Sequence, residues 1–166
     1  AIVASVSGGT LRNIFLGLKP ILITDPWVIG SIVTAVAITL SVRRVTKIGK
    51  TLLIMDTLGL AIATASGVQL AHNFNSPWYA TIILGVITAV TGGLLRDVLC
   101  QLEPVLLHRE TIATSSLCGA IAFVALIALD VEASVATIIG GVVVALVRML
   151  SIQFNLNLPK FKQAQT

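Results

Sequence analysis

Two arginines in strongly apolar stretches are the residues best placed to do chemistry. Arg12 and Arg96 each stand three positions after a glycine pair, Gly8-Gly9 and Gly92-Gly93. On insertion scales an arginine at the centre of a bilayer costs about 2.5 to 3.5 kcal/mol, so it is normally paired or faces water. The chemistry that this favours is the binding and guiding of ions. The alternative is that each arginine lies at a helix end and extends its charge to the lipid headgroups.

The glycine pairs also have two explanations. A pair of glycines removes two side chains and loosens the backbone, which allows a helix to kink or break. Close packing is the other explanation, because small residues let membrane helices approach each other. We favour the kink for these two pairs, since each is followed at the same distance by an arginine.

The two motifs belong to an internal repeat. Gly8 and Gly92 are 84 positions apart, and the same shift aligns further identical residues: Gly9/Gly93, Leu11/Leu95, Arg12/Arg96, Leu18/Leu102, Pro20/Pro104 and Leu22/Leu106. Asn13 stands where the second half has Asp97, so a carboxylate is not required there in both halves. A repeat must be recognised before the fold is predicted, because it decides the architecture.

Asp56 is an acidic residue near the start of another apolar stretch. It shares a helix face with Gly59, Ala63 and Gly67, and we expect it to partner an arginine or to attract a cation. A carboxylate stabilised by the positive N-terminal end of its own helix is the alternative. Asp97, beside the second arginine, is expected to stabilise the segment around its glycine pair.

Signatures of an enzyme are absent from the sequence. His72 and His108 are predicted in a turn and a loop, and neither belongs to a histidine, cysteine and carboxylate cluster with metal-ligand spacing. The glycine pairs do not continue into a Gly-Lys-Ser/Thr phosphate-binding loop. We therefore expect no enzyme, no cofactor and no metal beyond potassium in transit.

The composition is typical of a membrane protein. Of the 166 residues 56% are hydrophobic and 11% are charged, and the mean hydropathy is +1.00. A soluble protein could not bury so much apolar surface. Because about 20 helical residues cross the hydrocarbon core, we expect helical spans over residues 1–16 (the end of a span), 26–42, 52–71, 78–100, 111–129 and 133–154. The last of these has a stripe of small residues: Ser134, Thr137, Gly141 and Ala145.

Lysine and arginine predict the orientation. The loop after residue 42 has four basic residues, and Arg148, Lys160 and Lys162 lie near the C-terminal end, whereas alternate loops are nearly bare. Basic flanks stay on the cytoplasmic side, so we expect a cytoplasmic C-terminus, with Trp27 and Trp78 at the outer interface. This topology explains the net charge of +4 better than a nucleic-acid partner does.

Three spans lead from one motif to the other, so the two halves point in opposite directions. We therefore predict an all-α polytopic membrane protein with inverted three-helix repeats plus a last helix, a design associated with transport at the repeat interface. One transmembrane domain would comprise a partial first repeat (1–50), a second repeat (51–130), the last helix (131–155) and a cytoplasmic tail (156–166). The counterpart of the Asp56 span would lie before residue 1, so we expect a first span there and seven spans in the intact protein.

With residues 55–61 (Met-Asp-Thr-Leu-Gly-Leu-Ala), residues 156–159 (Leu-Asn-Leu-Pro) and the basic loop, these motifs resemble those of the prokaryotic trimeric intracellular cation (TRIC) channel family. Its bacterial members are also described as glycine transporters. The resemblance covers the chain except the expected first helix. It implies a homotrimer in a prokaryotic cell membrane, with one pore in each subunit lined by two helices that are kinked at the glycine motifs.

The resemblance adds four hydroxyl residues to the predicted pore. The pore-lining or gating residues are then Ser5, Ser7, Gly8, Gly9, Arg12, Asp56, Thr88, Thr91, Gly92, Gly93, Arg96 and Asp97. The family motif commonly has three glycines, two variable residues and Arg-Asp. Here Ser7 and Thr91 stand in place of the first glycine, and Asn13 in place of the first aspartate.

Three classes of function remain open. The first is a potassium channel in which backbone carbonyls and hydroxyl groups at the kinks replace hydration water, while the arginines shape or gate the path. The second is a secondary transporter of a small solute such as glycine, whose zwitterion suits an arginine with a carboxylate. The third is a structural or lipid-organising membrane protein. Expected partners are monovalent cations, membrane lipids and further copies of the chain, and no nucleic acid.

Overall fold

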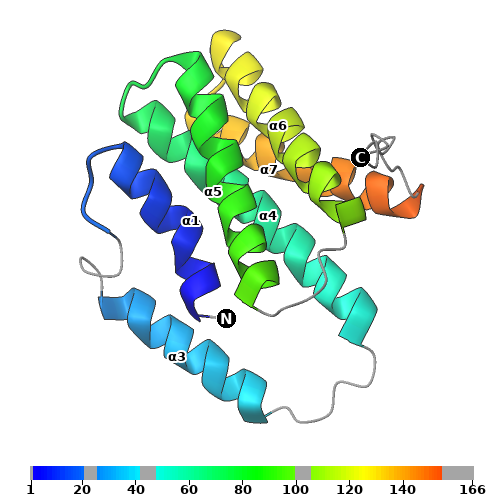
Figure 1. Ribbon diagram of the computed structural model, residues 1–166. Coiled ribbons are helices and arrows are strands. Elements are labelled where there is room, and N and C mark those ends of the chain that lie inside the picture. Colours follow the sequence, from blue (N-terminus) through cyan, green and yellow to red (C-terminus); the bar gives the residue numbers. More distant parts are fainter. Residues whose placement is uncertain (1, 21–25, 42–47, 100–105, 155–166) are drawn as a thin grey trace, which may run out of the picture.

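The computed structural model describes residues 2–20, 26–41, 48–99 and 106–154 (Figure 1). These residues form α1 (Ile2–Phe15), α3 (Pro26–Ser41), α4 (Ile48–Asn73), α5 (Trp78–Leu99), α6 (Leu106–Ala128) and α7 (Ala133–Gln153). The predicted all-α fold is confirmed for the described part of the chain. The side chains of Ser5, Arg96 and Asp97 lie outside what the structure describes.

Four of these helices are long and apolar enough to cross a membrane, namely α4, α5, α6 and α7. The described helices α1 and α3 have 14 and 16 residues, fewer than the roughly 20 that cross the hydrocarbon core. Two starts were predicted too late, because α4 begins at Ile48 and α6 at Leu106. The additional turns contain charged residues, which a hydropathy pattern assigns to loops.

The turns between α4 and α5 and between α6 and α7 lie where the sequence predicts them. Asn75, between α4 and α5, and Asp130, between α6 and α7, have positive φ angles of 52° and 57°. Short polar side chains of this kind tolerate the left-handed region better than other non-glycine residues do. Both turns are short, so α4 and α5 run antiparallel side by side, as α6 and α7 do (Figure 1).

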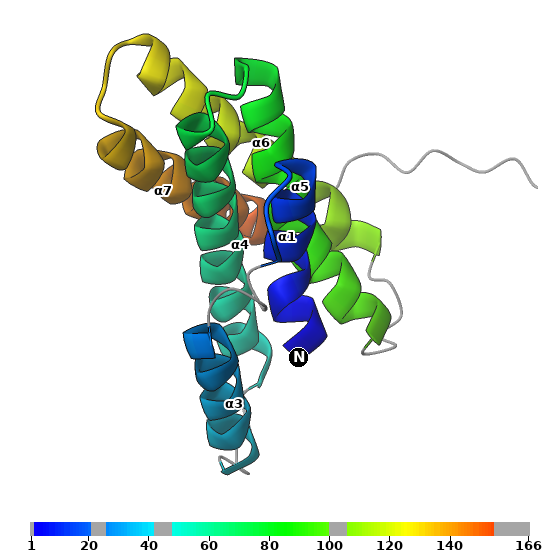
Figure 2. The ribbon, with the colours of Figure 1, turned by 90° about the vertical axis from the view of Figure 1, so that its left-hand side faces the viewer.

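Helix α4 is the centre of the bundle, and it contacts α5, α6, α7 and α1. Helix α5 packs between α1 and α6, while α7 packs on α4 and α6 (Figure 1). Helix α3 lies apart from the other helices in Figure 1, whereas in Figure 2 it is seen in front of the lower end of α4. Thus α1, from the first half of the chain, is held mainly by α5, from the second half.

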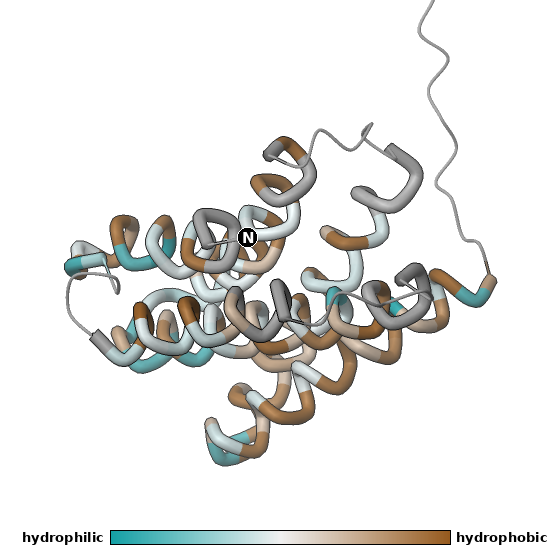
Figure 3. The backbone as a smooth tube through the Cα atoms, turned by 90° about the horizontal axis from the view of Figure 1, so that it is seen from below, coloured by the Kyte–Doolittle hydropathy of each residue, from teal (hydrophilic) through white to brown (hydrophobic). Residues whose placement is uncertain are grey.

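The interior is built from small and hydroxyl-bearing side chains. The residues Thr64, Ser115 and Ser116 are fully buried, and each hydroxyl donates to the carbonyl four residues earlier in its own helix. Such bonds satisfy a hydroxyl that has no water to bind. Many large apolar side chains are instead exposed on the outside, among them Ile62 and Ile138. Hydrophobic residues recur along the described helices (Figure 3). This arrangement suits a protein whose surroundings are lipid, where small residues mediate helix contacts.

Candidate functional site

Gly8 allows α1 and α5 to cross at contact distance. A methyl group added at Gly8 would overlap the backbone carbonyl of Thr88, so any larger residue would force the helices apart. Gly8 is also buried. Close packing therefore explains this first glycine of the motif.

Thr88 lies at the point where three helices meet. Its carbonyl faces Gly8 of α1, and its Oγ1 atom would be 3.0 Å from a Cβ atom added at Gly67 of α4. That same Cβ would be 2.9 Å from the Cα atom of Gly85. The Thr88 hydroxyl donates to the carbonyl of Leu84 at 2.6 Å, and the residue is only 4% exposed. Thr88 thus fills the junction of α1, α4 and α5.

The second glycine of each pair has a different environment. A Cβ atom added at Gly9 or at Gly93 would meet no atom within 4 Å. Both positions are half-buried, as is Thr91, whose hydroxyl donates to the carbonyl of Ile87 at 2.6 Å. These positions therefore leave room beside α1 and α5, which is what a path between helices would need.

Both motif helices are continuous. Helix α1 runs through Gly8-Gly9 and α5 runs through Gly92-Gly93 without leaving the α-helical state. A full break at the glycine pairs is therefore wrong for this structure. A bend within a continuous helix stays a prediction.

Arg12 is buried at the end of α1 and is held by neutral oxygen atoms. It is 7% exposed, so the alternative in which it reaches the lipid headgroups is wrong. Its NH1 atom donates to the carbonyl of Ser66 on α4 at 3.2 Å and lies 3.4 Å from the Ser66 hydroxyl. Its Nε and NH2 atoms donate to the Asn13 side-chain oxygen at 3.3 and 3.2 Å. The guanidinium group is therefore fixed between α1 and α4 by groups that carry no negative charge.

Asn13 completes this arrangement. Its Nδ2 atom donates to the carbonyl of Lys19 at 3.1 Å, which orients the amide so that its oxygen faces Arg12. An aspartate at this position, as in the second motif, could not make the donor half of this contact. The difference between Asn13 and Asp97 is thus used structurally in the first half.

Asp56 pairs with an arginine, which is one of the two roles expected for it, and that arginine is Arg148. Its Oδ2 atom lies 4.0 Å from the NH2 atom of Arg148 on α7, and the NH1 atom of Arg148 donates to the Thr111 hydroxyl on α6. Three helices thus meet at these polar side chains. Because α4 begins at Ile48, Asp56 lies beyond the first two turns, so the interaction with its own helix N-terminus is not its explanation.

Arg148 was predicted only as one of the basic residues near the cytoplasmic end. Its side chain is 2% exposed, so it is no headgroup-facing charge. A signal was present, because the buried residues of α7 are Ala136, Gly140, Val144 and Arg148 at a spacing of four. The stripe predicted for this helix lies on a neighbouring face, and its first member, Ser134, is exposed. The arginine continues a row of small buried residues.

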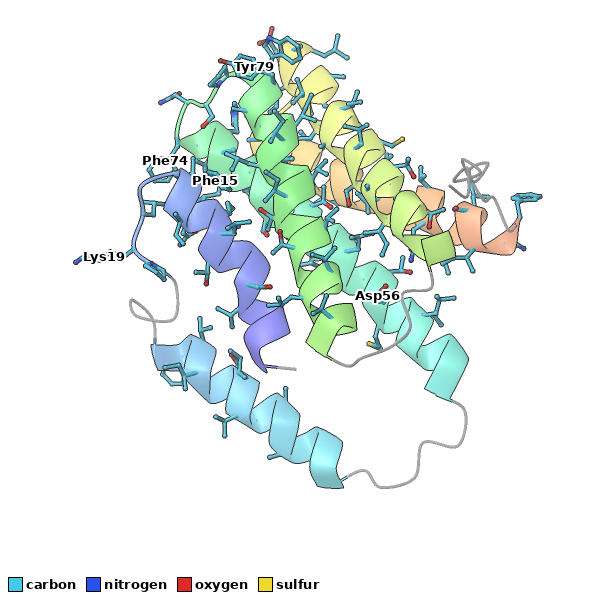
Figure 4. The ribbon with its side chains drawn as sticks, viewed as in Figure 1. Phe15, Lys19, Asp56, Phe74 and Tyr79 are labelled. Atoms are coloured by element: carbon cyan, nitrogen blue, oxygen red, sulfur yellow. The ribbon has the colours of Figure 1, made fainter. Side chains whose placement is uncertain are left out.

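The two buried arginines contact α4 at different depths. Ser66 follows Asp56 by ten positions, which is about 15 Å along a helix at 1.5 Å per residue. Asp56 lies in the half of α4 away from Phe74 and Tyr79, whereas Phe15, at the end of α1, lies near Phe74 (Figure 4). Helix α4 therefore carries one site for an arginine of α1 and another for an arginine of α7.

One cavity lies outside the predicted site. It has a volume of about 200 Å³ and is lined by residues that include His72, Thr81 and Phe123. The His72 and Phe123 rings contact edge to face, with centroids 5.8 Å apart. Within the described part of the chain no group of three histidine, cysteine or acidic residues is placed to hold a metal.

Comparison with known proteins decides the family. A family model described as a glycine transporter matches residues 53–129, from α4 to just beyond α6. The UPF0126 inner membrane protein YadS of Escherichia coli K12 is 34% identical over 164 residues, which cover 96% of this chain and 79% of YadS. A solved structure, described as the structural basis for conductance through TRIC cation channels, is 32% identical to this chain and has a TM-score of 0.82. The match covers 97% of this chain and 80% of the chain in that structure. The chain belongs to the TRIC family.

A second TRIC structure, the trimeric intracellular cation channel orthologue from Rhodobacter sphaeroides, agrees with this. It is 33% identical with a TM-score of 0.83, covering 93% of this chain and 80% of the orthologue. The resemblance inferred from the motifs is therefore confirmed, and so is a multi-pass membrane protein with the TRIC fold. Arg148 lies outside the residues that the family model matches, although the TRIC fold extends over α7.

Proposed function

We propose that this protein is a potassium-permeable cation channel with one pore in each subunit of a homotrimer. The observation that carries the proposal is the direct packing of α1 on α5, the two helices with the repeated glycine and arginine motif, within a fold similar to TRIC cation channels. In an inverted repeat the permeation path lies where the two halves meet. Here that meeting is made by α1 and α5.

The residues of this junction suggest how cations pass. Gly9 and Gly93 leave open space, so backbone and hydroxyl oxygens beside them are accessible to an ion that sheds part of its water. Arg12 keeps its charge on neutral acceptors, which makes it a barrier that limits cation flow. The proposed pore-lining set keeps Ser5, Ser7, Arg96 and Asp97 as predictions.

The proposal includes the topology. The division into a partial first repeat, a second repeat, a last helix and a tail follows the repeat, with the C-terminus in the cytoplasm of a prokaryote. Cysteine labelling from either side of the membrane tests this. A single cysteine at residue 160 should react only when the cytoplasmic face is accessible.

Planar-bilayer recording of the purified full-length protein tests the channel. We expect unitary potassium currents, reduced by Gly93→Leu because the larger side chain occupies the open space beside α5. The matched control is Ile138→Leu, which alters an exposed apolar side chain of α7 and should leave the current unchanged. Absence of unitary currents from intact trimers would refute the proposal.

A transporter of glycine is the second candidate, favoured by the description of the family model that matches residues 53–129. A buried arginine such as Arg12 is a suitable partner for a substrate carboxylate. Glycine uptake into liposomes distinguishes the two functions. Saturable uptake that is stimulated by internal glycine, without single-channel events, would favour the transporter over the channel.

A further inference from the structure

We propose that Arg148 of α7 controls the charge that α4 presents to cations at Asp56, and thereby tunes cation flow. The inference rests on the proposed channel function. Arg148 would be a positioning residue that acts through Asp56 and does not itself touch the ion. Three observations carry this: the unequal burial of the two side chains, the geometry of their contact, and the way α7 is packed.

The two side chains of the pair differ in how far they are buried. The Arg148 side chain is 2% exposed, whereas the Asp56 side chain is 21% exposed. An ion at the surface of α4 can therefore approach the carboxylate, but it cannot approach the guanidinium group. The arginine thus acts on such an ion through its charge.

The contact is one of charge more than of a tight hydrogen bond. The NH2 atom of Arg148 and Oδ2 of Asp56 are 4.0 Å apart, whereas charge-assisted hydrogen bonds between such groups are typically about 2.7 to 2.9 Å long. The NH1 atom instead donates to the hydroxyl of Thr111. Thr111 of α6 therefore fixes the guanidinium group, and Asp56 keeps a partly exposed carboxylate close to it.

Docking of α7 does not by itself require this arginine. Gly119 of α6 and Gly140 of α7 meet at contact distance, and Gly141 lies against Ala65 of α4. Val144 is fully buried in the same row as Arg148. Apolar residues often hold helices as well as a buried ion pair does, so a role in charge control explains the arginine better than packing alone.

The pair should then behave electrostatically. Arg148→Gln leaves the carboxylate less compensated and should raise the unitary potassium conductance, while Asp56→Asn leaves the arginine less compensated and should lower it. At about 20 mM salt, one unit charge ~8 Å away changes the local cation concentration roughly twofold, whereas at about 1 M the ~3 Å Debye length removes the effect. The double variant restores neutrality and should conduct like the wild type.

Planar-bilayer recording of the full-length wild type and the three variants, at low and at high potassium, tests the inference. Glu132→Gln is the matched control, because it removes an exposed negative charge from the turn before α7. It should leave the unitary conductance unchanged at both potassium concentrations. Opposite shifts of about twofold at low salt, lost at high salt and in the double variant, would support the proposal. Shifts in the same direction, or equal at both salts, would overturn it.

One further variant, Arg148→Lys, together with the double variant keeps the test decisive if a single change weakens folding. Arg148→Lys and the double variant both keep the pair neutral, so each should match the wild type at both salt concentrations. A folded double variant with a lasting change in conductance at high salt would show that the pair acts only structurally. A wild-type protein without currents would instead refute the channel itself, and with it this use of the pair.

Discussion

The first glycine pair contains its own control, because its two members face different surroundings. A methyl group at Gly8 would overlap the backbone carbonyl of Thr88, whereas one at Gly9 would meet no atom within 4 Å. We therefore expect Gly8→Ala to destabilise the protein and Gly9→Ala to leave it unchanged or slightly more stable. The two changes are chemically identical and occupy adjacent positions of one helix.

The size of the destabilisation by Gly8→Ala depends on whether α5 can move away from α1. Helix α5 cannot retreat freely from α1, because the Thr88 side chain already lies 3.0 Å from the Cβ position at Gly67 of α4. Overpacking of this kind costs about 1 to 3 kcal/mol. At Gly9 the exchange of glycine for alanine within a helix contributes roughly 0.5 to 1 kcal/mol in the opposite direction. The same gain applies at Gly8, so the two variants should differ by the overpacking cost, about 1 to 3 kcal/mol.

Thermal unfolding in one detergent, at one protein concentration, measures this difference. For a chain of this size 1 kcal/mol corresponds to roughly 2 to 4 °C in Tm, so Gly8→Ala should melt about 2 to 12 °C below Gly9→Ala. A cysteine pair across α1 and α5 should also cross-link more slowly in Gly8→Ala. Equal Tm values for the two variants would refute the close crossing of α1 and α5.

Changes at three further sites test how the helices of the bundle pack, each by the same unfolding measurement. Gly67→Ala should destabilise by about 1 to 2 kcal/mol, less than Gly8→Ala, because its closest clash is at 2.9 Å; no loss would contradict the α4–α5 contact. Asp56→Asn should lower the free energy of unfolding by about 3 kcal/mol, because it leaves buried Arg148 without this carboxylate. The double variant Asp56→Leu with Arg148→Met should lower it less, because no buried charge is left. A larger loss in the double variant would contradict the buried pair. Phe123→Ala, at a site 1% exposed, should cost about 3 to 5 kcal/mol, and a change below about 1 kcal/mol would show that the site is not closely packed.

The positions of the helices could be predicted from the sequence, but their partners could not. Hydropathy located all six described helices because an apolar run of this length has one stable form in lipid. It misplaced the starts of α4 and α6, where the first turns contain charged residues. A helix boundary of this kind depends on what surrounds the turn, which composition does not report.

The arginines show the same limit more clearly. The position of Arg12 in an apolar stretch predicted that it would be paired or face water, and the structure buries it against neutral oxygen atoms. That its acceptor is Ser66, and that Asp56 faces Arg148, depends on which faces of α1, α4 and α7 meet. Those faces are determined by close contacts such as that of Gly8 with Thr88. Hydropathy does not report them, because it measures the polarity of a residue and not the space that its side chain leaves.

The repeat predicts an equivalent close contact for the second motif. The shift of 84 positions relates Gly8 to Gly92 and Thr88 to Ala4, so a two-fold related crossing would set Gly92 against the carbonyl of Ala4. Gly9 and Gly93 already share open surroundings, as the repeat requires. Gly92→Ala should then destabilise by about 1 to 3 kcal/mol, as Gly8→Ala does, while Gly93→Ala should be neutral. If Gly92→Ala and Gly93→Ala melt together, the two halves are related in sequence but do not cross symmetrically.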